Sequence, residues 1–125
     1  MSKYRIAVIK KHDIERRLAS MVLPRYGMDF ELFDCPESFL DYQGEMPDCI
    51  VCGVWFDQKM TAMGFLGVLR ERGLSIPVVI ASNMTDYQDQ VMQAGAVSFT
   101  DGFLSDGAAI VSAIIEAIES RQVVA

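Results

Sequence analysis

Two cysteines, Cys49 and Cys52, have the C-x-x-C spacing that zinc sites and disulfide oxidoreductases use. They lie in the apolar run CIVCGVWF (49–56), which predicts a buried strand that continues into a loop. Residues three apart on a strand point to opposite faces, so these two thiols are not expected to meet. The single histidine, His12, has no obvious partners that would complete a metal site. We therefore expect structural cysteines, no metal site and no cofactor.

The elements that position these residues alternate between strands and helices. The predicted strands are Tyr4–Lys10, Phe30–Asp34, Cys49–Val54, Pro77–Ser82 and Val97–Thr100. The predicted helices are a segment from Asp13 to Gly27, Pro36–Tyr42, Thr61–Arg72, a segment from Thr85 or Asp86 to Gly95, and Ser105–Arg121. Three strands are continuously apolar, which is typical of a parallel sheet covered on both faces. The order predicts a doubly wound α/β fold with a five-stranded parallel sheet.

The first helix has a distinct apolar pattern. Asp13 is expected to cap it, Pro24 to weaken its last turn and Gly27 to end it. Helical spacing places four apolar side chains on one face: Ile14, Leu18, Met21 and Val22.

In a doubly wound sheet, functional side chains lie at the carboxyl ends of the strands. In this sequence those ends are Lys10, Lys11, Gly53, Ser82 and the segment Thr100–Gly102. A glycine therefore stands where the third strand would normally present a side chain to the site.

The composition limits the function classes. The chain has 125 residues, which predicts a single domain over 1–125. Its net charge of −6 argues against direct nucleic-acid binding and against an anionic membrane surface. No apolar run is long enough for a membrane span or a signal peptide. Together with only three cysteines, these features predict a cytoplasmic protein.

Three segments carry a family resemblance: PDCIVCGVW, IPVVIAS and MQAGAVSF (92–99). From Tyr4 to Arg121 the chain resembles a bacterial response-regulator receiver domain of the CheY-like or FixJ-like type. The resemblance implies the strand order 2-1-3-4-5. It also implies phosphoryl transfer onto an aspartate at the end of strand 3, with Mg²⁺ held by an acidic pair after strand 1. A hydroxyl after strand 4 and a lysine after strand 5 would bind the phosphoryl oxygens.

Most of these roles fall on residues that cannot perform them. The nucleophile position falls on Gly53, the acidic pair on Lys10 and Lys11, and the strand-5 lysine on Gly102, which Phe103 follows. Only the strand-4 hydroxyl, Ser82, is retained. One ammonium about 5 Å from a divalent cation costs on the order of 6–7 kcal/mol at an effective dielectric of ~20. The resemblance therefore points to a degenerate pseudo-receiver that neither binds Mg²⁺ nor accepts a phosphoryl group in the usual way.

Several residues near the pocket have alternative interpretations. Asp57 and Asp48 are either displaced phosphoacceptors or solvated loop acids, and Asp57 could instead pair with Lys10 or Lys11. The two lysines are either solvated or part of an anion site. Trp55 either covers the space beside Gly53 or is an exposed anchor for a partner.

Ser82 and Phe99 match the family's switch pair, although Phe99 could simply belong to the core and Ser82 could cap a strand end. We expect a non-enzymatic signalling module that contacts a protein partner through helix 4, strand 5 and helix 5, and a second copy of the chain is one candidate for that partner. Two alternatives remain, a small-ligand or anion sensor that uses the altered pocket and a phosphoacceptor that uses Asp57.

Overall fold

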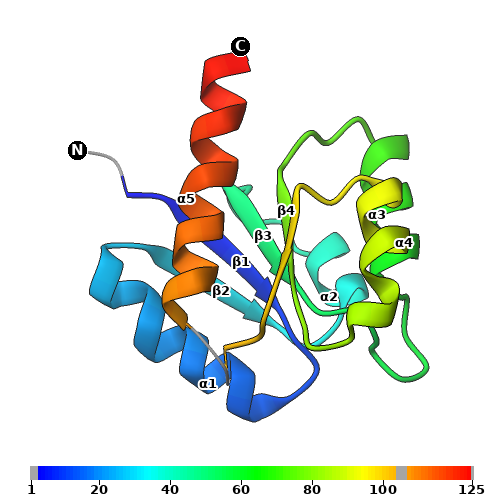
Figure 1. Cartoon of the computed structure of the whole chain (residues 1–125), viewed down its shortest axis with the longest axis horizontal. Coiled ribbons are helices and arrows are strands. Elements are labelled where there is room, and N and C mark those ends of the chain that lie inside the picture. The colour runs from blue at the N-terminus through cyan, green and yellow to red at the C-terminus, as the bar shows by residue number, and fades with distance from the viewer. Residues whose placement is uncertain (1–2, 104–106, 125) are drawn as a thin grey trace.

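The three strands with continuous apolar runs, Arg5–Ile9, Cys49–Cys52 and Val78–Ala81, are almost entirely buried, whereas the two edge strands are more exposed. The computed structural model describes residues 3–103 and 107–124 (Figure 1). The strands are β1 (Arg5–Ile9), β2 (Asp29–Phe33), β3 (Cys49–Cys52), β4 (Val78–Ala81) and β5 (Ser98–Thr100). They form one parallel sheet in the order β2-β1-β3-β4-β5, which confirms the predicted fold class and strand order.

The helices follow the expected alternation with short 3-10 turns added. They are α1 (Asp13–Val22), α2 (Pro36–Leu40), α3 (Ala62–Glu71), α4 (Gln88–Ala94) and α5 (Gly107–Val124). Two 3-10 turns, η1 (Leu23–Tyr26) and η2 (Thr85–Tyr87), follow α1 and precede α4. Pro24 lies in η1, and Gly27 ends it with a φ of 73°, as its place in the sequence predicts. The predicted first residue of the last helix, Ser105, lies outside the described residues.

Two hydrophobic cores lie on opposite faces of the sheet. Alternate residues of β1 divide between them: Ala7 and Ile9 face α2, α3 and α4, whereas Ile6 and Val8 face α1 and α5. The cysteines of β3 divide in the same way, Cys52 joining the first core and Cys49 the second. The two thiols therefore point away from each other, as expected from their spacing.

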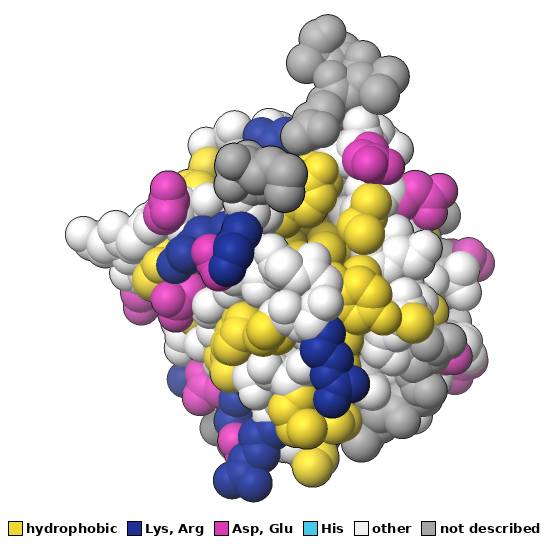
Figure 2. Space-filling view, turned by 90° about the vertical axis from the view of Figure 1, so that its left-hand side faces the viewer, with side chains coloured by type: hydrophobic (Ala, Val, Ile, Leu, Met, Phe, Trp, Pro, Cys, Tyr) yellow, Lys and Arg dark blue, Asp and Glu magenta, His cyan; other side chains and the backbone are white. Residues whose placement is uncertain are grey.

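The buried face of α1 matches the predicted apolar face only in part, with Leu18 and Val22 packed against the core. Ile14 and Met21 are exposed, whereas Glu15 and Ala19 are buried against the sheet. The cap was also predicted wrongly, because Asp13 is the first helical residue and His12 occupies the N-cap without a side-chain hydrogen bond. Helix α1 is therefore oriented with the Glu15 carboxylate, and not Ile14 or Met21, toward the interior of the protein. Figure 2 shows hydrophobic side chains spread between Lys and Arg on the side of the molecule that carries α1 and β2.

Candidate functional site

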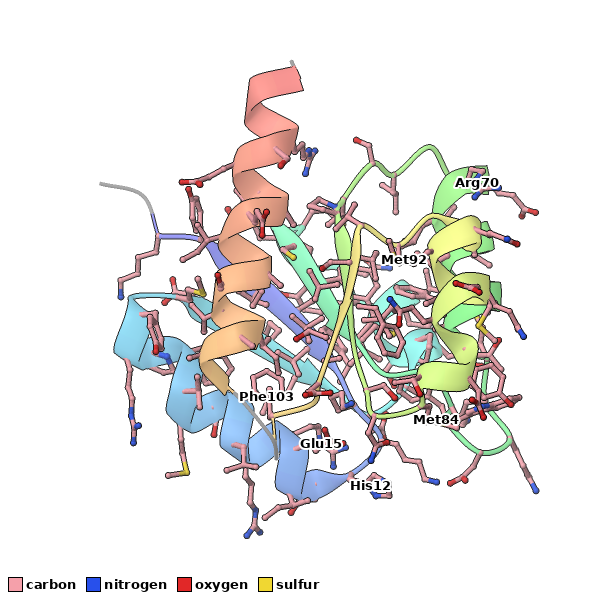
Figure 3. All side chains as sticks on the ribbon, in the orientation of Figure 1. His12, Glu15, Arg70, Met84, Met92 and Phe103 are labelled. Carbon is pink, nitrogen blue, oxygen red and sulfur yellow. The ribbon has the colours of Figure 1, made fainter. Side chains whose placement is uncertain are left out.

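The carboxyl ends of β1, β3 and β4 meet at one end of the sheet, because the strands are parallel. A pocket of about 460 Å³ opens there. Its lining includes the predicted pocket residues except the two candidate phosphoacceptors, Asp57 and Asp48. Asp48 directly precedes β3 and its carboxylate accepts a hydrogen bond from the Arg5 backbone N–H at 2.8 Å. The lining residues are Lys10, Lys11, His12, Glu15, Gly53, Val54, Trp55, Ser82, Asn83, Met84 and Gly102. Figure 3 shows His12, Glu15, Met84 and Phe103 around this end of the sheet.

Lys10 enters the pocket rather than solvent. It follows β1 directly, and only 5% of its surface is exposed. Its Nζ donates to the carbonyl oxygen of Ala81 at 2.5 Å and lies 3.2 Å from Glu15 Oε1. A buried ammonium needs such acceptors, because the loss of hydration is otherwise uncompensated. Lys10 therefore ties the ends of β1 and β4 to α1.

Glu15 is the residue that the sequence analysis missed. It is only 9% exposed and supplies the carboxylate of the buried ion pair. One signal was present in the sequence, since Glu15 shares a helical stripe with Ala19 and Val22. A charged residue in the stripe that faces a core is unusual and calls for a buried partner.

The two glycines at strand ends provide the space for this ion pair. A Cβ added at Gly53 would lie 3.3 Å from Lys10 Nζ, and a Cβ added at Gly102 would lie 2.8 Å from Glu15 Oε1. The ammonium thus occupies the space beside position 53 into which a side chain would extend. The carboxylate does the same beside position 102. The glycine at the end of the third strand therefore leaves room for the Lys10 ammonium, which a Cβ at this position would crowd.

A second ion pair lies at the exposed rim. Lys11 Nζ is 2.6 Å from Asp57 Oδ1, and the side chains are 36% and 69% exposed. Of the two partners considered for Asp57, Lys11 is the one it contacts, while Lys10 contacts Glu15. Asp57 has a φ of 58°, a left-handed conformation that aspartate tolerates better than most residues.

The retained hydroxyl is engaged locally. Ser82 is buried and its Oγ accepts a hydrogen bond from the Met84 backbone N–H at 3.0 Å. Phe99 is half-buried, lies opposite Ile80 in the β4–β5 register and packs against the core under α2, α3 and α4. The structure thus places Ser82 in the pocket and Phe99 on the neighbouring strand.

Trp55 combines features of both interpretations made for it. It lines the pocket, yet 40% of its surface is exposed. Its ring packs edge to face against Tyr87 with 5.4 Å between centroids. This contact connects the loop after β3 to the turn η2 that leads into α4.

Cys49 and Cys52 are poor nucleophiles, because both thiols stay protonated near neutral pH. Burial raises the pKa of Cys49 and of Cys52 to about 12, because a thiolate would be poorly solvated in either core. Within the described ranges, no three His, Cys, Asp or Glu side chains gather closely enough to hold a metal ion.

Several solved structures of response regulators share this fold. Full-length FixJ from B. japonicum matches with a TM-score of 0.83 and 22% identity over 95% of this chain, which spans 59% of that protein. A FixJ-N structure matches with a TM-score of 0.76 and 20% identity, over 96% of each chain. The receiver domain of Francisella response regulator 1452 matches with a TM-score of 0.78 and 14% identity, over 95% of this chain and 99% of that one.

The fold is that of a receiver domain. At these identities the likeness is one of fold, and it confirms the receiver-like architecture expected from the sequence. Neither a comparison with protein-family models nor one with curated proteins finds a match. Among the described residues, no helix has the length and apolar character needed to cross a bilayer.

Proposed function

We propose that this chain is a pseudo-receiver, a cytoplasmic signalling module of the bacterial two-component type that acts through protein contacts without conventional aspartyl phosphorylation. The observation that carries this proposal is the buried Lys10–Glu15 ion pair, which lines the pocket at the strand ends. Receiver chemistry requires a carboxylate nucleophile and a bound divalent cation. In this pocket Gly53 stands at the position of the nucleophile, and the Lys10 ammonium stands where ligands of the cation are expected.

Electrostatics weigh strongly against a metal ion in this pocket. Lys10 cannot easily move away, because its ammonium is buried and holds both Ala81 and Glu15. A divalent cation about 5 Å from that ammonium would be repelled by on the order of 6–7 kcal/mol at an effective dielectric of ~20. Glu15 offsets part of this repulsion, but its carboxylate is already paired with Lys10. The proposed module therefore needs no cofactor and catalyses no reaction.

The two alternative functions have weaker support. Phosphorylation of Asp57 would require an exposed carboxylate that is paired with Lys11 and lies outside the pocket lining. An anion sensor would need free positive charge in the pocket, but Lys10 is paired with Glu15 and Lys11 with Asp57.

The proposed partner surface consists of α4, β5 and α5. Two hydrophobic side chains are exposed at α4 and beside β5, Met92 and Val97, with Val97 48% exposed. If two copies associate through this surface, Met92→Asp should weaken the dimer in sedimentation equilibrium. Met21→Asp on α1 is the matched control, because Met21 is more exposed than Met92 and lies on another helix. A dimer that is weakened only by the control substitution would exclude this surface.

The phosphorylation-independent part of the proposal is tested with Mg²⁺ and beryllofluoride, which imitates an aspartyl phosphate. Amide spectra of the protein should not change at Gly53, Ser82 or Phe99, and the Trp55 indole signal should not move. Saturable shifts at these positions would refute the proposal. The Asp57→Asn variant would then show whether Asp57 is the acceptor, because the shifts would disappear.

Two designed variants test why the protein is expected not to respond to Mg²⁺ and beryllofluoride. Gly53→Asp restores a carboxylate but leaves the Lys10 ammonium beside it, so this variant should also remain silent to Mg²⁺ and beryllofluoride. Adding Lys10→Asp should produce Mg²⁺-dependent shifts, because it replaces the repelling ammonium with an oxygen ligand. A response from Gly53→Asp alone would show that Lys10 does not block the metal.

A further inference from the structure

An open groove of about 680 Å³ lies at the other end of the sheet from the Lys10–Glu15 pocket. It runs between α3 and α4 on one side and α5 on the other, beside the amino-terminal ends of β4 and β5. Val97 borders the first residue of β4 in this groove, where its backbone N–H donates to the Val78 carbonyl at 2.9 Å, and β5 begins at the next residue, Ser98.

The floor and walls of the groove are mainly apolar. On α5 the wall is made of two small residues four positions apart, Ala113 and Ala117, which leave room between α5 and the sheet edge. Val97 is 48% exposed at the opening. The remaining apolar lining is Leu66, Leu69, Leu74, Ile76, Pro77, Val78 and Ala94.

The charges of the groove are at its rim. Arg70 reaches from α3 to α4, where its Nη2 donates to the Ala94 carbonyl at 2.6 Å. A guanidinium has five N–H donors, so this hydrogen bond leaves others for a ligand. Arg121 lies at the rim from α5, together with Glu116. Two arginines and one glutamate give the groove an excess of positive charge in a chain whose net charge is −6.

We propose that this groove binds a small amphipathic anion, with its apolar chain along the groove and its carboxylate at the rim that carries Arg70 and Arg121. The volume lies within the range of small-molecule sites, about 300–1,000 Å³, and four separate chain segments line it. Such a site has the usual composition of a ligand pocket, an apolar lining with a few polar groups at defined positions. Beyond the proposed function, a ligand in this groove would give the module a chemical input at α4, β5 and α5, the elements of its proposed partner surface.

The first test is an amide NMR titration with sodium decanoate below its micellar concentration. Saturable shifts are expected at the amides of Leu74, Val97, Ala113 and Ala117. Decanol, which has the same chain length and no charge, should bind more weakly. Arg121→Gln should weaken decanoate binding about two- to fivefold, which is typical of one exposed ion pair.

A matched pair of variants separates groove binding from general adsorption. Val97→Asp places a negative charge at the groove opening and should abolish saturable binding. Met21→Asp makes the same change at an exposed position on α1 and should leave binding unchanged. Equal affinity for decanol, or unchanged binding by Val97→Asp, would overturn the proposal. Absence of saturable shifts would overturn it as well and would leave the groove as a surface for protein contact only.

Discussion

The two ion pairs at the strand ends allow a direct test of what burial does to a charge. Lys10 and Glu15 are buried and 3.2 Å apart, whereas Lys11 and Asp57 are exposed and only 2.6 Å apart. If distance decided the energy, the second pair would be the stronger one. If burial decides it, removing one member of the first pair leaves an uncompensated charge inside the protein, which costs about 3–5 kcal/mol.

We expect Lys10→Met and Glu15→Leu each to lower the free energy of unfolding by about 3–5 kcal/mol. This is a large fraction of the ~5–15 kcal/mol that stabilises a typical domain. The double variant replaces the pair with apolar side chains of similar size and should lie within about 2 kcal/mol of the unchanged protein. Lys11→Met and Asp57→Asn at the exposed pair should each cost about 1 kcal/mol or less.

Urea unfolding of the six proteins measures these values, with equal slopes required for comparison. The double-mutant cycle gives the coupling energy between Lys10 and Glu15, which should be several kcal/mol. Additive effects of Lys10→Met and Glu15→Leu would refute the argument. So would a Lys10→Met variant as stable as Lys11→Met, because the buried ammonium would then have no special role.

Three further predictions follow from the same structure. Gly102→Ala should lower the melting temperature, because the added Cβ would lie 2.8 Å from Glu15 Oε1. The decrease caused by Gly102→Ala should be smaller when it is made in the Glu15→Ala variant, and an equal decrease in that variant would contradict the prediction. The free energy of unfolding should fall as pH rises above about 9, because the thiols of Cys49 and Cys52 ionise in the unfolded chain but keep a pKa of about 12 when folded. Unfolding in urea at pH 8 and pH 10 should therefore show a smaller loss when both cysteines are replaced by alanine, and equal losses would argue against the raised pKa values. Tyr87→Ala should shift the fluorescence of the single tryptophan to longer wavelength, because its edge-to-face contact is lost, and an unchanged spectrum would show that the contact does not shield the indole.

The fold was predictable because its strands carry a strong pattern. Continuous apolar runs such as VVIA in β4 are typical of a parallel sheet with two covered faces, and the structure has this sheet in the expected order. The pocket lining was largely predictable for the same reason, since the ends of parallel strands must meet. Lys10, Gly53 and Ser82 all lie where this rule places them.

The contacts inside the pocket were not predictable from the pattern. The rotation of α1 depends on a balance between burying Ile14 or Met21 and pairing Glu15 with Lys10. Helical spacing favours the first outcome, and the structure has the second. The place of Glu15 in the stripe of Ala19 and Val22 signals that it needs a buried partner, but nothing in the periodicity of the sequence identifies that partner as Lys10.

The mutual fit of Lys10, Glu15, Gly53 and Gly102 also constrains how this sequence can change. A route to a pocket with acidic groups on β1 and β3 must remove the ammonium and fill the glycine positions. Taken one substitution at a time, the early steps either strand a charge in the interior or crowd the remaining one. Such intermediates are expected to be less stable than the present protein, so single substitutions at these four positions are disfavoured.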